Sequence, residues 1–248
     1  MRRIAALILL ALFTLTVAAQ ERAVMNQLSG KPEIAPEALA TITGLSLDVV
    51  PEQARTLRQL PLSLAGVTVT VEGQVAPLRY VGKREIVFLV PRMPIRFNKH
   101  FVTVTIHAPG EEIQIPAAWN YSAPGLLCYG RPKDGCAPQA IYRYGRASPA
   151  LMDSIPVSLS TDGAETVVQF FGTGFRRANA RTVEVKLCGE MPLEILFIGP
   201  DSFIDGLDVV AVKLPTRLPA SCAPTEQAIT LSVAGRGSNS VVVILREQ

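Results

Sequence analysis

The two histidines are the first residues to test for chemistry, because imidazole serves both catalysis and metal binding near neutral pH. His100 and His107 flank one predicted strand at a spacing of seven, so their side chains point to opposite faces of a sheet. They cannot converge on one metal ion or nucleophile from that strand. A Ser-His-Asp triad also needs a serine on a strained elbow of the GxSxG type, which the sequence lacks. We therefore expect no catalytic residues and no enzyme.

Three carboxylates crowd one predicted turn, at Asp201, Asp205 and Asp208. Clustered oxygen ligands can hold calcium, but the EF-hand spacing and its closing glutamate are missing, so we interpret the segment as a solvated turn. The Gly-Thr-Gly run at 172–174 lacks the lysine and helix of a phosphate-binding loop, and we interpret it as a tight turn after a strand. The sequence thus predicts no metal and no cofactor.

One segment is rich in side chains that binding surfaces favour. The single tryptophan and four of the five tyrosines lie between residues 119 and 144, with arginines among them. The candidate ligand or partner surface comprises Trp119, Tyr121, Tyr129, Arg131, Tyr142, Arg143, Tyr144 and Arg146. Tyrosine and arginine bring large contact areas with polar tips, and aromatic faces stack on sugars. The alternative is that these rings pack the contact between two domains, each hydroxyl finding a backbone partner. Both interpretations stay open at this stage.

The four cysteines are Cys128, Cys136, Cys188 and Cys222. An even number in an exported chain favours two disulfides. Of the three pairings, we favour Cys128–Cys136, which closes a short loop, and Cys188–Cys222. A zinc site would need close CxxC spacing, which is absent.

The N-terminus has the pattern of a cleaved signal peptide. Arg2 and Arg3 precede an uncharged apolar run over 4–17, and Val17-Ala18-Ala19 predicts cleavage before Gln20. The run is shorter than the roughly 20 residues that span a bilayer, which disfavours a membrane anchor. We expect a secreted protein of the periplasm, cell surface or extracellular space, with no membrane span after cleavage. The formal net charge of +3 falls further when the signal leaves, so we expect no nucleic-acid partner.

Short strands dominate the rest of the chain. Residues 67–72 alternate apolar and polar with period two, and 86–90 and 102–106 are further apolar strand segments, with glycine and proline between them. Residues 51–60 are the best helical candidate, and we interpret them as a helical turn in a loop.

The same strand pattern recurs in the second half. Residues 67–73 match 183–189, and Tyr80-Val81-Gly82 matches Phe197-Ile198-Gly199. Inward apolar positions stay in phase in every pair, because a one-residue slip would turn the core face to water. Two domains of about 100 residues each with short strands are typical of β-sandwiches.

Several of these residues resemble a known bacterial family. Residues 60–73 (LPLSLAGVTVTVEG), 76–78 (APL) and 122–126 (SAPGL) are similar to runs in the Solibacter-type uncharacterised C-terminal domain, which is abundant in exported acidobacterial proteins. The resemblance extends from about Ala35 to the C-terminus. It implies tandem immunoglobulin-like domains of the IPT/TIG kind and no assigned activity. The chain departs from the family where Glu85 and Val87 replace polar Gln and Asn.

These observations give one prediction of architecture and function. We expect an all-β protein with two tandem immunoglobulin-like (IPT/TIG-like) sandwiches after the signal peptide. The predicted boundaries are a signal peptide at 1–19, an N-terminal linker at 20–34, domain 1 at 35–127, an aromatic and arginine linker at 128–147 and domain 2 at 148–248. We expect a non-catalytic exported structural or binding module of the cell envelope or extracellular space. Its partner would be a polysaccharide or an envelope protein. The alternative is a carbohydrate-binding accessory protein of a secreted polysaccharide-degrading system.

Overall fold

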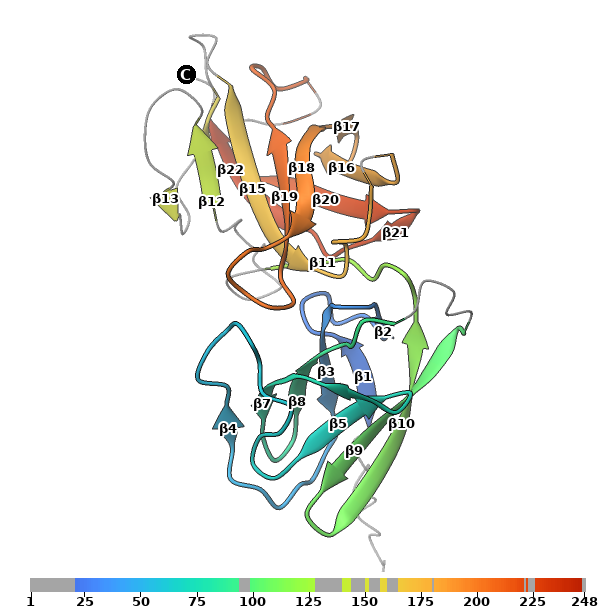
Figure 1. The fold of residues 1–248 in the computed structure, drawn as a ribbon. Helices are drawn as coiled ribbons and strands as arrows, with labels where there is room; N and C mark the ends of the chain where they lie inside the picture. The colour runs from blue at the N-terminus through green and yellow to red at the C-terminus, as the bar shows by residue number, and fades with distance from the viewer. Residues whose placement is uncertain are drawn as a thin grey trace, which may run out of the picture.

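The computed structural model describes residues 21–93, 99–127, 140–143, 150–151, 157–159, 165–179, 181–220, 222 and 226–246 of the 248-residue chain. The predicted signal peptide at 1–19 lies outside the described residues, as do Cys128 and Cys136. Figure 1 shows two separate groups of strands, one from each half of the chain, stacked end to end. Every described element is a strand, so the predicted all-β class is confirmed.

The first sandwich consists of strands β1 to β10. They are β1 (Ala23–Asn26), β2 (Glu33–Ile34), β3 (Leu39–Thr43), β4 (Glu52–Gln53), β5 (Thr68–Val71), β6 (Gln74–Ala76), β7 (Leu78–Val81), β8 (Ile86–Leu89), β9 (Phe101–Ala108) and β10 (Glu111–Trp119). One sheet has the order β1-β3-β8-β7-β4 and the other β2-β10-β9-β5-β6. The chain passes repeatedly between the two sheets, as in immunoglobulin-like sandwiches.

The second sandwich repeats this plan with strands β11 to β22. They are β11 (Gly125–Leu126), β12 (Ala140–Arg143), β13 (Ala150–Leu151), β14 (Val157–Ser158), β15 (Thr166–Thr173), β16 (Val183–Leu187), β17 (Met191–Pro192), β18 (Glu194–Pro200), β19 (Asp208–Lys213), β20 (Glu226–Val233), β21 (Arg236–Gly237) and β22 (Val241–Arg246). Its sheets have the orders β13-β12-β15-β19-β18, with β11 also on β15, and β14-β22-β20-β16-β17, with β21 also on β20.

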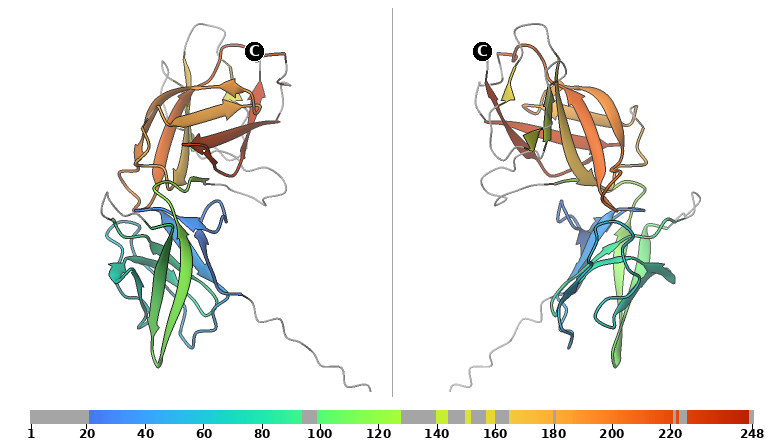
Figure 2. Two further views of the ribbon diagram at one scale, coloured as in Figure 1. Left: turned by 90° about the vertical axis from the view of Figure 1, so that its right-hand side faces the viewer. Right: turned by 60° about the vertical axis from the view of Figure 1, so that its left-hand side comes forward.

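The two sandwiches match strand for strand. The order β1-β3-β8-β7 corresponds to β12-β15-β19-β18, and β2-β10-β9-β5-β6 corresponds to β14-β22-β20-β16-β17. In each domain the short first strand of the second sheet runs parallel to its neighbour, β2 to β10 and β14 to β22. Both hairpins that leave β5 and β16 turn through two positive-φ residues, Glu72-Gly73 and Cys188-Gly189. The repeat predicted from the sequence is therefore present in the fold (Figure 2).

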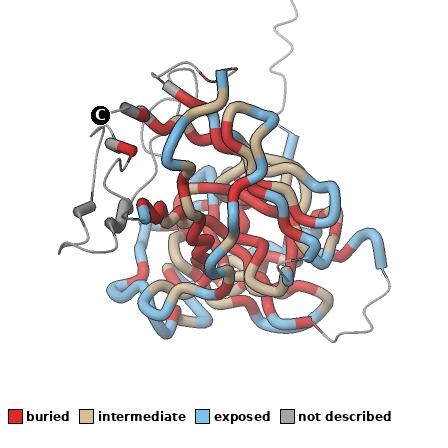
Figure 3. The backbone as a smooth tube through the Cα atoms, turned by 90° about the horizontal axis from the view of Figure 1, so that it is seen from above, coloured by how far each residue is buried: buried red, intermediate tan, exposed pale blue. Residues whose placement is uncertain are grey.

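Alternating burial explains why these segments form strands. Val67, Val69 and Val71 are fully buried, while Thr68 and Thr70 between them are half-exposed. The matching residues Val183, Val185 and Leu187 are buried in the second core. Apolar residues on one face of each sheet leave water by packing against the facing sheet, which stabilises the sandwich by roughly 25 cal/mol per Å² of apolar area. Seen from above, buried segments gather toward the middle of the molecule and many exposed ones lie on the outer loops (Figure 3).

Three predicted segments differ from the structure. Residues 20–34 are not a linker throughout, because β1 pairs with β3 and β2 pairs with β10. The predicted linker at 128–147 contains β12, which pairs with β15 and so belongs to the second sandwich. Residues 51–60 contain the short strand β4 and no helical turn. In each case a tertiary partner supplies backbone hydrogen bonds to a short segment with no strand pattern of its own.

The second sandwich also carries a covalent link. Cys188, in the β16–β17 turn, bonds to Cys222, with their Cα atoms 5.9 Å apart. The predicted Cys188–Cys222 pairing is confirmed. Nowhere in the described part of the chain is there a helix long and apolar enough to cross a membrane.

Candidate functional site at the domain junction

Trp119 is a core residue and not part of an exposed surface. It lies at the end of β10, pairs with Ile34 of β2, and is only 3% exposed. Ile113, Ile115 and Ala117 precede it at alternate positions and are buried in the same core. The prediction that Trp119 forms part of a ligand surface is therefore wrong. The period-two run that ends at Trp119 is the sequence signal that places it inside.

The other predicted surface residues fall into three groups. Tyr121 is exposed, just after β10. Tyr142 and Arg143 lie on β12, where their backbones pair with Val167 and Thr166 of β15. The remaining four, Tyr129, Arg131, Tyr144 and Arg146, lie outside the described residues. The carbohydrate-binding alternative predicts exposed rings among Tyr129, Tyr142 and Tyr144, and it stays a prediction.

The histidines do not come together. His107 lies on β9, half-exposed, with its Nδ1 3.2 Å from Glu112 Oε2. His100 precedes β9, and its carbonyl oxygen accepts a hydrogen bond from the Trp119 backbone N–H at 2.8 Å. Within the described ranges, no group of three or more His, Cys, Asp or Glu side chains is placed to hold a metal ion.

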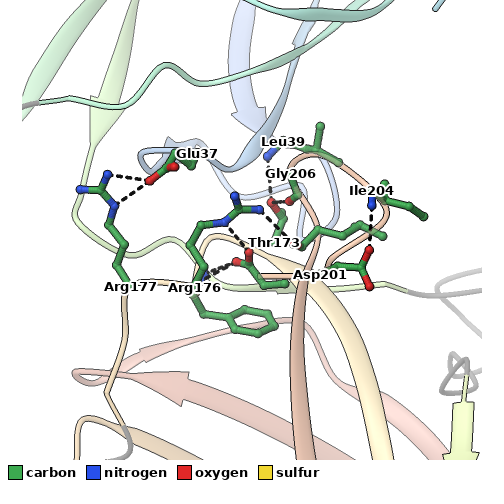
Figure 4. Close-up of polar contacts among 11 residues, drawn as sticks. Glu37, Leu39, Thr173, Arg176, Arg177, Asp201, Ile204 and Gly206 are labelled. Atoms are coloured by element: carbon green, nitrogen blue, oxygen red, sulfur yellow. Dashed lines mark hydrogen bonds and ion pairs between the residues drawn. The ribbon is translucent and has the colours of Figure 1, made fainter. Parts of the chain in front are cut away.

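The structure instead concentrates polar contacts where the two sandwiches meet. We call this region the domain junction. Its first-domain side consists of β1, the 35–39 segment, the 57–59 loop and Ala123. Its second-domain side consists of the 173–177 turn and the 201–207 loop. Figure 4 shows side chains from both sides meeting here. Ala35, Ala38 and Ala123 form a small buried apolar cluster within it.

Asp208 is the most buried charge of the junction. Its side chain is 0% exposed at the start of β19, and it is not in a solvated turn as predicted. Oδ2 accepts hydrogen bonds from the backbone N–H groups of Phe175 (2.7 Å) and Arg176 (2.9 Å), and Oδ1 accepts one from Arg176 Nε at 2.6 Å. Arg176 Nη2 also donates to the Leu207 carbonyl at 2.9 Å. One carboxylate thus fixes the turn that faces the first domain.

Burial raises the pKa of Asp208 to about 6, because desolvation disfavours the charged carboxylate. The Arg176 charge and the hydrogen bonds to Phe175 and Arg176 act in the opposite direction and offset part of this effect. The carboxylate is therefore mostly ionised at neutral pH, where it pairs with Arg176. Its environment is that of a structural ion pair, since its hydrogen-bond partners Phe175 and Arg176 lie within the same domain.

Thr173 connects the two domains through one hydroxyl. Its Oγ1 accepts a hydrogen bond from the backbone N–H of Leu39 in the first domain (2.8 Å) and donates one to the Gly206 carbonyl (2.6 Å). The residue is fully buried, so loss of the hydroxyl would leave two backbone groups without this partner. Gly172 and Thr173 belong to β15, so the tight turn predicted at 172–174 starts only at the left-handed Gly174, with φ of +82°.

Gly174 also allows the close approach of the two domains. A Cβ built at this position would lie 2.0 Å from the Ala123 carbonyl oxygen. The Gly174 carbonyl accepts a hydrogen bond from the Ala123 N–H at 3.0 Å. Gly206 is similarly confined, since its Cβ would lie 2.6 Å from the Leu39 side chain. At Gly174 a Cβ would meet backbone atoms, and at Gly206 it would meet the Leu39 side chain, so a larger residue at either position forces a neighbour to move.

Further contacts surround this centre. Arg177 donates two hydrogen bonds to Glu37 Oε2, at 2.9 and 2.6 Å, with both side chains mostly shielded from water. On one flank, Asp205 accepts from the Gln59 N–H at 2.7 Å, and its own N–H donates to the Leu57 carbonyl at 2.8 Å. On another flank, Arg236 lies 2.9 Å from Glu33. Ion pairs and hydrogen bonds between the two domains thus surround the centre of the junction on several sides.

Comparisons with known proteins find similar solved structures and no matching family. No protein-family model and no curated protein matches the chain. Among solved structures, it is similar to "Titin Ig tandem domains A164-A165", at 10% identity over 87% of this chain and 91% of that one, with a TM-score of 0.25. It is also similar to "Structure of the S-layer protein SbsC, domains 5-6", at 13% identity over 92% and 97%, with a TM-score of 0.25. The protein is a tandem of immunoglobulin-like β-sandwiches, a class that its own sheet orders define. Neither likeness transfers a function to it.

Proposed function

We propose that this protein is a non-catalytic structural or binding module that acts outside the cytoplasm as a rigid pair of domains. The observation that carries the proposal is the domain junction, where buried Thr173 links Leu39 of one sandwich to Gly206 of the other. Linked domains move relative to one another by default unless their interface is extensive. Here a buried hydroxyl bridge, a shielded ion pair and two confined glycines restrict that motion.

A rigid pair of sandwiches supports two related tasks. It keeps whatever is attached at one end at a fixed distance and angle from the other end. It also presents the loops of both domains in one constant arrangement, so a ligand that touches both pays little ordering entropy. The contacts described at the junction are directed at other groups of the same chain, which favours a positioning role over a reactive one.

Three sequence features support action outside the cytoplasm. The predicted signal peptide at 1–19 directs export. Disulfides persist in oxidising compartments, and Cys188–Cys222 is such a bond. The resemblance to the Solibacter-type family fits the same proposal, because that family implies exported immunoglobulin-like domains and no activity.

Small-angle X-ray scattering of the mature protein tests this proposal. We expect the wild-type curve to fit one arrangement of the two domains. A double variant, Thr173→Val with Arg177→Ala, removes the hydroxyl bridge and the Glu37 ion pair, and we expect its curve to require a spread of arrangements. The matched control is Lys186→Ala, which removes an ion pair with Glu184 within one strand, away from the junction. A wild-type curve that already requires many arrangements would overturn the rigid-module proposal.

A further inference from the structure

Strand β18 forms one edge of the second sandwich. It pairs with β19 on one side, and among the described residues no strand pairs with its other side (Figure 1). Leu196 is 46% exposed and Phe197 is 50% exposed on this strand. Glu194, at its start, is the only charged residue between 194 and 200. An exposed apolar edge is unusual, because edge strands commonly carry charges that prevent pairing with other chains.

The equivalent strand of the first sandwich is covered. β7 matches β18, and its outer side pairs with β4 through Glu52↔Val81 and Gln53↔Tyr80. The two strands agree in detail. Each has an irregular register before its aromatic residue, at Leu78/Tyr80 and at Ile195/Phe197. Each aromatic ring also covers the glycine two residues later, Gly82 or Gly199. The bulge does not prevent strand addition, since β4 pairs with β7 immediately beyond it.

Among the described residues of the second sandwich, no segment is equivalent to β4. In the first domain, residues 44–67 connect β3 to β5 and contain β4. In the second domain, the matching connection between β15 and β16 is only residues 174–182, and its described residues contain no strand. The position that β4 occupies on β7 is therefore not filled on β18 by the corresponding part of the chain.

We infer that β18 pairs with β18 of a second copy of this chain, in an antiparallel two-fold dimer centred on Phe197. Phe197 and Ile198 match Tyr80 and Val81, to which β4 pairs. A two-fold axis brings the same apolar edge of each copy against the other. With Phe197 on the axis, Glu194 of each copy faces Pro200 of the other, roughly 20 Å from the second Glu194, so no two carboxylates face each other in the ladder. The polar β4 edge, with exposed Glu52 and Gln53, lacks this self-complementarity.

Sedimentation velocity of the mature protein tests this dimer from micromolar to near-millimolar concentration. We expect a monomer–dimer equilibrium in the wild type and its weakening by at least about tenfold in Phe197→Lys, which places a charge on the edge. The control is Phe101→Lys, because Phe101 is more exposed at 66% but lies on β9 between β10 and β5. We expect this control to dimerise like the wild type.

Hydrogen exchange provides a second measurement that needs no variant. We expect the backbone amides of β18 in the wild type to exchange more slowly at high concentration, while those of β4 do not change. A wild type that stays monomeric at every concentration would overturn the inference. This holds even if β18 of the monomer binds a peptide from another protein, because the inference names a second copy as the partner. Equal dimerisation of wild type and Phe197→Lys would also overturn it. The scattering test of junction rigidity is separate, because it compares domain arrangement within one chain.

Discussion

In the first sandwich the outer side of β7 carries β4, whereas in the second the equivalent side of β18 carries no strand among the described residues. The second sandwich has two features of its own, the Cys188–Cys222 bond and the Arg176–Asp208 ion pair. At the position that matches Asp208, the first sandwich has the exposed Arg84. Both sandwiches keep the same strand order although they differ in an edge strand, a disulfide and a buried ion pair. The shared strand order therefore does not depend on these edge and turn features.

The largest expected effect comes from Asp208→Ala. It leaves Arg176 and the Phe175 N–H without their buried acceptor, and breaking a buried ion pair in this way costs about 3–5 kcal/mol of unfolding free energy. Urea denaturation measures the loss, and hydrogen exchange assigns it to a domain. We expect the second sandwich to lose protection while the first keeps it. A loss below about 1 kcal/mol would mean that Asp208 does not anchor the 173–177 turn.

The second prediction concerns the Cys188–Cys222 bond, whose removal takes away one of the features that distinguish the second sandwich from the first. We expect the double variant Cys188→Ser with Cys222→Ser to lose about 2–4 kcal/mol, because the link limits the unfolded chain across a sequence separation of 34. Thermal unfolding with reductant added to the wild type gives an independent measurement. A melting temperature of the second domain that both treatments leave unchanged would contradict this prediction.

A smaller effect is expected from pH. The pKa of Asp208 in the folded protein is about 6, above its ordinary value of 3.8, so the native state binds a proton that the unfolded state lacks between these values. Stability from this group therefore rises as pH falls from 7 to 5, by about 1 kcal/mol. The comparison is with Asp208→Asn, which does not titrate. We expect the wild type to gain stability over this variant on acidification, and a gap that is constant or shrinks would contradict the raised pKa.

Much of the fold is predictable from the sequence for a local reason. Period-two alternation at 67–72 and its repeat at 183–188 fix which side chains face the core, and no distant partner is needed to detect them. The same rule correctly places Trp119 in the core, whereas the clustering of aromatic residues leaves both a surface and a domain contact open. The sequence places three short strands, β1, β2 and β12, in linkers. Short strands depend on pairing with a neighbouring strand, and the spacing of residues in the sequence does not identify that strand.

Most residues of the domain junction cannot be predicted from the local sequence pattern. The sequence indicates a turn at Gly174 and a carboxylate cluster that includes Asp208, but the partners of both residues are far away along the chain. Thr173 joins Leu39 and Gly206, and Arg177 joins Glu37, across separations that only the packed domains bring within hydrogen-bond distance. Neither Glu37 nor Arg177 stands in a motif, so composition gave no reason to select them.

The sequence by itself determined the strand class and the repeat of the strand pattern in the two halves, and it favoured Cys188–Cys222 among three possible pairings. The strand class and the repeat follow from side-chain hydrophobicity at alternate positions. Tertiary structure alone decided the domain boundaries, the burial of Asp208 and the edge of β18 on which no other described strand lies. Each of these depends on which surfaces meet after the sheets have formed, and those contacts are set by shape and desolvation across the whole molecule rather than by neighbours in the chain.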